Sequence, residues 1–224
     1  MCGMDLSVNS PAVCVVVEEQ GQRTWHVACF ACRKNDHKAP LRSIGNACLH
    51  VLPRVPDSSH PDMVRYKHIV DQITRFMEDK GVDSSTDIVC ENYAYKPNDQ
   101  AAHSDKLHEV SGILRYTVHE KWPSKVVRRI GIGTWKKLVV GTGNASKLDV
   151  VNHVNTLLGT DLMDAFGLKL TKDGSVPCPV QDFADSLCVA ASALPDMHKP
   201  KKRKLPRQNG ATKKKKKTIK TTTV

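Results

Sequence analysis

Short apolar runs near the beginning of the chain predict β-strands. Residues 12–17 read Ala-Val-Cys-Val-Val-Val, and residues 24–32 form a second apolar run after a turn at residues 19–22. Residues 2–7 form a shorter strand before them, and residues 87–91 form another apolar strand that ends in an acid. Runs of this length, rich in β-branched residues and bounded by turn residues, are typical of strands in a sheet.

Later segments carry apolar residues at helical spacing and alternate with further strands. The expected helices cover residues 63–80, 101–122, 146–158 and 181–191, and the expected later strands cover residues 126–132 and 137–140. Strands first, followed by strands and helices in alternation, predict an α/β fold: a mixed sheet flanked by helices on both faces.

Four carboxylates stand where this fold could bring them together. Asp5 lies on the first strand, and Glu91 ends the strand at residues 87–91. Asp182 and Asp185 are three residues apart, so they share one side of the last helix. Acids in a first helical turn also favour the helix dipole, which leaves capping open for this pair. Four acids close together raise each other's pKa unless cations bind, which favours a Mg²⁺ site.

The chain resembles the RuvC-type Holliday-junction resolvases of the RNase H-like superfamily. The resemblance lies in the order of three elements: a strand with Asp5, a strand with Glu91 and a late helix with D-x-x-D. Residues 136–147 also look like the family segment in which a G-x-G turn after a strand leads into a helix through a lysine. The resemblance runs from about residue 2 to about residue 194. The family usually has Pro-Gly after its first Asp, whereas this chain reads Asp5-Leu-Ser-Val-Asn-Ser-Pro.

The resemblance implies an RNase H-like fold and a structure-selective endonuclease that resolves four-way DNA junctions. It implies two Mg²⁺ ions, replaceable by Mn²⁺, held by Asp5, Glu91, Asp182 and Asp185, with Asp5 bound to both. Hydrolysis would leave 5′-phosphate and 3′-hydroxyl ends. In the family the helix corresponding to residues 101–122 contributes to a homodimer, which suits a two-fold symmetric junction.

A basic stretch predicts the DNA-binding surface. Residues 121–147 contain seven Lys or Arg and no acid, with Trp122 and Trp135 among them. A solvated charged face is the alternative, but phosphate binding is favoured. The residues assigned to DNA contact are Lys136, Lys137, Lys147, Arg128 and Arg129.

Two tyrosines follow Glu91 and are assigned to the same surface. Family members use an aromatic residue in this loop to wedge between bases at the junction centre, and Tyr93 and Tyr95 both occupy it. Core packing, or orientation of a carboxylate, remains open for either ring.

Positive charge is concentrated at the C-terminus. Of 34 Lys and Arg, twelve lie in residues 195–224, where Asp196 is the only acid. We therefore expect a nuclease domain over residues 1–194 and a disordered Lys-rich tail over residues 195–224. The tail could tether DNA through its charge or direct nuclear import.

Other features bound the setting of the protein. No apolar run approaches the ~20 residues of a membrane span, and the N-terminus lacks a signal-peptide pattern. We expect an intracellular protein of the cytoplasm or nucleoid, or of the nucleus in a eukaryotic host, with no membrane partner and with cysteines as free thiols. A zinc site at Cys29 and Cys32 with His26 and His37 is a minor alternative, since strand geometry turns the two thiols to opposite faces.

Two other functions stay open. Another RNase H-like nuclease, cutting flaps, Y-junctions or RNA/DNA hybrids, would use the same acids. A non-enzymatic basic DNA-binding protein would explain the tail and the basic stretch but not the four acids.

Overall fold

A mixed sheet is the centre of the fold. The computed structural model describes residues 1–31, 41–92 and 101–199. Within them the sheet has seven strands in the order β4-β5-β3-β2-β1-β6-β7. The strands are β1 (Cys2–Asp5), β2 (Ala12–Glu19), β3 (Gln22–Phe30), β4 (Leu41–Ile44), β5 (Ala47–Leu52), β6 (Ile88–Asn92) and β7 (Val127–Gly131). The pair β1–β2 is antiparallel, whereas β1–β6 and β6–β7 are parallel, so the sheet is mixed as predicted.

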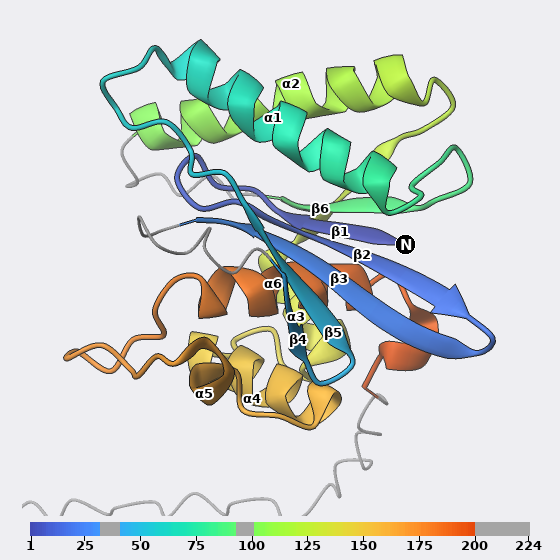
Figure 1. Cartoon of the computed structure of the whole chain (residues 1–224), viewed down its shortest axis with the longest axis vertical. Helices are drawn as coiled ribbons and strands as arrows, with labels where there is room; N and C mark the ends of the chain where they lie inside the picture. The colour runs from blue at the N-terminus through green and yellow to red at the C-terminus, as the bar shows by residue number, and fades with distance from the viewer. Residues whose placement is uncertain (32–40, 93–100, 200–224) are drawn as a thin grey trace, which may run out of the picture.

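Helices cover both faces of the sheet (Figure 1). Helices α1 and α2 lie on one face, and α3 to α6 lie on the other. The helices are α1 (Asp62–Asp79), α2 (Ala101–Lys121), α3 (Ile132–Val139), α4 (Lys147–Leu158), α5 (Leu162–Phe166) and α6 (Val180–Ala191), followed by the 3-10 helix η2 (Pro195–Met197). This confirms the predicted α/β fold, a mixed sheet flanked by helices on both faces.

The central strands are apolar on both sides because both of their faces are covered. In β2, Cys14 and Val16 belong to the core beneath α6, whereas Val13 and Val15 belong to the core beneath α1 and α2. This burial explains why β2 reads as a continuous apolar run instead of an alternating one.

One predicted strand is wrong. Residues 137–140 belong largely to helix α3, whose Trp135 and Val139 are both buried. These two residues are four apart and therefore share one helix face, while Lys136 and Lys137 fall outside it. Consequently the G-x-G turn at Gly141 and Gly143 follows a helix, not a strand, before it leads into α4.

The hairpin β4–β5 and the short helix α5 were not predicted. Strand β4 reads Leu-Arg-Ser-Ile and lies at the sheet edge. Its conformation therefore depends more on pairing with β5 than on its own residue types. The Gly45-Asn46 turn between the two strands, with Gly45 at φ +59°, was a usable hairpin signal. Helix α5 has only five residues and begins at the Asp161 cap.

The remaining predicted elements are confirmed, with ends shifted by a few residues at most. Ser146 caps α4 in a capping box: its side chain accepts the N–H of Asp149, and Asp149 accepts the N–H of Ser146. None of the helices in the described segments has the length and apolar character that crossing a membrane requires. The cysteines described by the structure are all free thiols.

The chain beyond α6 stays in contact with the domain as far as Lys199. The backbone N–H of Lys199 donates to the carbonyl of Leu138 in α3 at 2.7 Å, and Arg23 pairs with Asp196. Residues 200–224 lie outside the described segments, so the disorder of the tail and the division of domains at residue 194 stay predictions.

Candidate active site

Asp5 and Glu91 lie side by side on two parallel strands. In the register of β1 and β6, Met4 is opposite Cys90, so Asp5 and Glu91 each follow a paired residue. Met4 and Cys90 pack beneath α1 and α2. Because side chains alternate along a strand, Asp5 and Glu91 belong to the opposite face, which α6 covers.

A glycine lets helix α6 lie directly on β1. A Cβ at Gly3 would be 2.1 Å from the backbone nitrogen of Ala190 and 2.7 Å from its Cβ. No side chain other than hydrogen fits there, so Gly3 determines how closely α6 approaches the strand that carries Asp5. The start of the same helix carries Asp182 and Asp185.

The two acids of α6 are not its N-cap. Pro179 occupies the cap position and makes no side-chain cap bond. Asp182 lies in the first turn and is 6% exposed, whereas Asp185 lies one turn further along and accepts a hydrogen bond from Gln181 Nε2 at 3.2 Å. Favourable interaction with the helix dipole remains for Asp182, but burial at this depth is unusual for a residue that serves only this purpose.

Burial raises the pKa of three of these carboxyl groups. The pKa of Asp182 is raised to about 8, first by burial and then by the neighbouring Cys178 thiol, while a hydrogen bond with Ser10 lowers it. The pKa of Glu91 is raised to about 7 by burial and by the charge of Asp185. Burial also raises the pKa of Asp185. Three acids are thus kept in an environment that disfavours their ionised form, which a bound cation would reverse.

The donor set suits a hard cation, but its members have not converged on one point. Asp5, Glu91, Asp182 and Asp185 offer only carboxylate oxygens, the ligands that Mg²⁺ prefers. In the described part of the chain, no three His, Cys, Asp or Glu side chains are arranged closely enough to hold a metal ion. The residue types and the buried acids with raised pKa therefore fit a divalent cation, and closure around it requires side-chain movement.

Trp135 lies within the basic stretch of residues 121–147 but is not on its exposed surface. Trp135 is 1% exposed, and its Nε1 donates to Glu91 Oε2 at 2.7 Å. The indole thus fixes one oxygen of a candidate ligand from within the core. An indole N–H that is buried needs an acceptor, but the pairing with Glu91 depends on how α3 packs against α6 and β7 and has no signal in the sequence.

Two of the predicted DNA-binding lysines lie near the acids. Lys136 lowers the pKa of Glu91 and of Asp185 through its charge, and its Nζ donates to the carbonyl of Ala145 at 2.8 Å. Lys147, the first residue of α4, also lowers the pKa of Asp185. These two lysines therefore provide positive charge next to the carboxylates, where a phosphate would be attracted.

The other predicted DNA-binding residues are further from this centre or cannot be placed. Lys137 is on the exposed side of α3, and Arg128 and Arg129 are exposed on β7, the edge strand of the sheet. Tyr93 and Tyr95 lie outside the described residues. So do Cys32 and His37 of the alternative zinc site, whose remaining members have other surroundings: Cys29 is buried in the core, and His26 lies 3.3 Å from His50.

Comparison with protein-family models and with curated protein sequences finds no match. Among solved structures, the chain is similar to RuvC of Thermus thermophilus, with a TM-score of 0.52 and 17% identity over 89% of this chain and 99% of that one. The same protein in complex with a Holliday junction substrate gives a TM-score of 0.56 and 16% identity over 89% and 97% of the two chains. The yeast mitochondrial Holliday junction resolvase Ydc2 gives a TM-score of 0.47 and 14% identity over 85% of this chain and 75% of that one. The chain therefore has the RNase H-like fold of RuvC.

Proposed function

We propose that this protein is an endonuclease that resolves four-way DNA junctions by metal-dependent hydrolysis of phosphodiester bonds. The observation that carries the proposal is the placement of four acids at one end of a RuvC-type fold. Asp5 and Glu91 lie on neighbouring strands, on the face covered by α6, and Asp182 and Asp185 begin that helix. The Thermus RuvC structure bound to a Holliday junction supports branched DNA as the substrate class.

Asp5, Glu91, Asp182 and Asp185 would hold two Mg²⁺ ions, for which Mn²⁺ can substitute. Bound metal would supply activation of a water molecule and stabilisation of the negative charge on the leaving 3′ oxygen. Trp135 would hold Glu91 in place through its 2.7 Å hydrogen bond. The charges of Lys136 and Lys147 would attract the scissile or an adjacent phosphate.

A DNA arm would extend from these lysines across the exposed basic side chains. Lys137, Arg128 and Arg129 are all exposed on α3 and β7, which follow each other directly in the chain. Arg128 is paired with Val89 and lies on the side of the acids, whereas Arg129 is paired with Cys90 and faces the other side of the sheet edge. Contacts of this kind bind phosphate without reading sequence and weaken as salt rises. They would hold the duplex while the acids select the bond that is cut.

We further propose that two copies act on one junction, because resolution requires paired cuts in two strands. Helices α1 and α2 expose large apolar side chains: Met63 is 61% exposed, Val64 48% and Tyr116 65%. Exposed apolar side chains on these two helices support pairing of two chains on this side of the sheet, through α2.

The test is cleavage of end-labelled DNA with Mg²⁺, comparing a mobile four-way junction, a flap, an RNA/DNA hybrid and a linear duplex of equal length. Wild type is compared with Asp5→Asn, and with Asp79→Asn as a control on an exposed acid near the end of α1. We expect paired symmetric nicks in the junction, lost in Asp5→Asn and retained in Asp79→Asn.

Other patterns would change the assignment. Equal cutting of flaps would make the protein a general debranching nuclease, and preference for the hybrid would move it to the ribonucleases of this fold. If the protein binds these DNAs but cuts none of them with any divalent metal, nuclease activity is contradicted and a DNA-binding protein remains.

A further inference from the structure

Arg65 is a buried cation on the face of the sheet opposite the acids. It lies in the first turn of α1 and is 6% exposed. Its Nε donates to the carbonyl of Pro56 at 3.0 Å and its Nη1 to Asp62 Oδ1 at 3.1 Å. A buried guanidinium is costly unless its donors are satisfied, so these bonds indicate a specific role in the fold.

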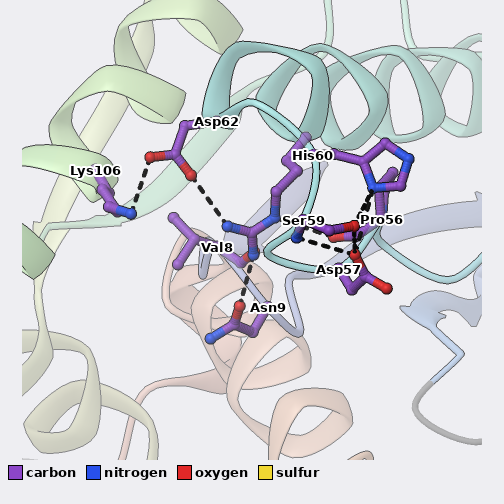
Figure 2. Close-up of polar contacts among 9 residues, drawn as sticks. Val8, Asn9, Pro56, Asp57, Ser59, His60, Asp62 and Lys106 are labelled. Atoms are coloured by element: carbon purple, nitrogen blue, oxygen red, sulfur yellow. Dashed lines mark hydrogen bonds and ion pairs between the residues drawn. The ribbon is translucent and has the colours of Figure 1, made fainter.

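The remaining donors of Arg65 hold the turn that follows Asp5. Nη2 donates to the carbonyl of Val8 at 3.0 Å and to Asn9 Oδ1 at 2.8 Å (Figure 2). Both acceptors belong to the six residues between β1 and β2. Arg65 therefore connects this turn to α1 and to the segment before it.

Asp62 is paired with a second cation besides Arg65. Its other oxygen pairs with Lys106 of α2 at 2.9 Å (Figure 2). The carboxylate is shared by two cations, so much of the Arg65 charge is balanced by the oxygens of the turn. Loss of Arg65 would consequently release the turn and leave Asp62 paired with Lys106.

The turn held by Arg65 reaches the acids on the other side of the sheet. Ser10 directly follows Asn9, and its hydroxyl lies 3.9 Å from the sulfur of Cys178, which precedes the helix that carries Asp182. The Ser7 hydroxyl accepts the backbone N–H of Ser10 at 2.8 Å and of Asn9 at 3.2 Å. A set of contacts thus runs from Arg65 through the turn to Cys178, four residues before Asp182.

We propose that Arg65 is a positioning residue: it fixes the turn between Asp5 and β2 so that Asp5 and Asp182 are held ready for a divalent cation. This inference rests on the proposed function. This chain lacks the Pro-Gly pair that usually follows the first Asp of RuvC-type enzymes, and Arg65 supplies from outside the rigidity that the turn sequence lacks.

The test compares Arg65→Gln and Arg65→Lys with Arg75→Gln, which removes an exposed arginine from the same helix. The first readout is the thermal midpoint of each protein titrated with Mg²⁺ in the absence of DNA. The second is the Mg²⁺ dependence of junction cleavage. We expect Arg65→Gln to raise the half-saturating Mg²⁺ about 10-fold in both readouts, with cleavage at saturating Mg²⁺ within about twofold of wild type.

Arg65→Lys, which keeps one charge but not the fork of donors, should lie between wild type and Arg65→Gln. Asn9→Ala leaves Arg65 in place and removes one acceptor from the turn, so it tests the same connection if Arg65→Gln does not fold. It should raise the half-saturating Mg²⁺ about threefold.

A lower metal-free midpoint with unchanged half-saturating Mg²⁺ in both Arg65→Gln and Asn9→Ala would overturn the inference and reduce Arg65 to a stabilising residue. If wild type cuts junctions and these variants have the same Mg²⁺ dependence as wild type, this inference alone is overturned and the proposed function stands. Wild type with neither cleavage nor a Mg²⁺-dependent midpoint would overturn the proposed function and this inference together.

Discussion

Buried charge is treated in opposite ways on the two sides of the sheet. On the α1 side, Arg65 is buried with four hydrogen bonds to carbonyl, amide and carboxylate oxygens. On the α6 side, Glu91 and Asp182 are buried and Glu91 accepts a hydrogen bond from Trp135, but the pKa of each carboxyl stays well above its ordinary value.

The difference separates a charge that stabilises the fold from charges kept for another purpose. A buried ion whose donors are satisfied by fixed oxygens is complete within the protein. Acids with raised pKa are a net cost to the folded state, which a protein retains where function requires them. The α6 side is therefore the side on which a cation should have a large effect.

The largest expected effect is on the α6 side. Asp182→Asn should lower junction cleavage about 1000-fold, equivalent to about 4 kcal/mol of transition-state stabilisation, because it removes a proposed metal ligand. The same change should raise the metal-free thermal midpoint at pH 8, since it removes a buried acid. The measurements are cleavage rates and thermal unfolding, with Asp79→Asn as control; a lower midpoint would mean that Asp182 stabilises the fold like Arg65.

Gly3→Ala tests whether the approach of α6 to β1 builds the site. The added methyl group would overlap Ala190, and we expect a loss of about 3 kcal/mol in the free energy of unfolding, together with weaker cleavage. Gly112→Ala is the control, because a Cβ there has no neighbour within 4 Å, and it should stabilise α2 by about 0.5–1 kcal/mol. The free energy of unfolding of both variants is measured with denaturant. Equal changes in the two variants would contradict the close contact between Gly3 and Ala190.

Stability without metal should fall as pH rises. The pKa of Glu91 is raised to about 7 and that of Asp182 to about 8 in the folded protein. Both acids are therefore protonated in the folded state at pH 5, whereas in the unfolded chain they ionise at about pH 4. Stability is consequently lost progressively as pH rises from about 4 to about 8. In EDTA the thermal midpoint should drop by on the order of 5 °C between pH 5 and pH 9.

Mg²⁺ should restore the midpoint at pH 9, and Asp182→Asn should flatten the profile. A midpoint that is independent of pH would show that the buried acids are already compensated within the protein.

The smallest expected effect sharpens the role of the indole. Trp135→Phe keeps a ring in the core but removes the N–H that holds Glu91, so the half-saturating Mg²⁺ for cleavage should rise about 10-fold. Trp25→Phe, at another fully buried tryptophan, is the control for lost packing. If both variants change the Mg²⁺ dependence equally, the hydrogen bond to Glu91 has no part in metal binding.

Sequence pattern was sufficient for elements whose own residues determine their structure. Strands β1, β2 and β6 and helices α1, α2, α4 and α6 carry long apolar runs or helical spacing, because each buries its apolar side chains in the core. Segment 137–140 was misread as a strand because four consecutive residues that include Leu138 and Val139 fit either period. Strand β4 was missed because it depends on pairing with β5 for its conformation.

The candidate site divides in the same way. The order strand-Asp5, strand-Glu91 and helix with Asp182 and Asp185 could be found from the sequence, because period two and period 3.6 place each acid on a face of its own element. The roles of Trp135 and Arg65 could not, since each acts through a partner 44 or more residues away in the chain.

The sequence by itself determined the class of fold, the acids proposed to bind metal and the lysines near them, because these depend on residue type and local period. Only the tertiary structure decided how deeply the acids are buried, which donors reach them and how the turn after Asp5 is held. Those properties arise from contacts between distant segments, above all from Gly3 beneath α6, Trp135 behind Glu91 and Arg65 beneath the turn, and no local pattern encodes such contacts.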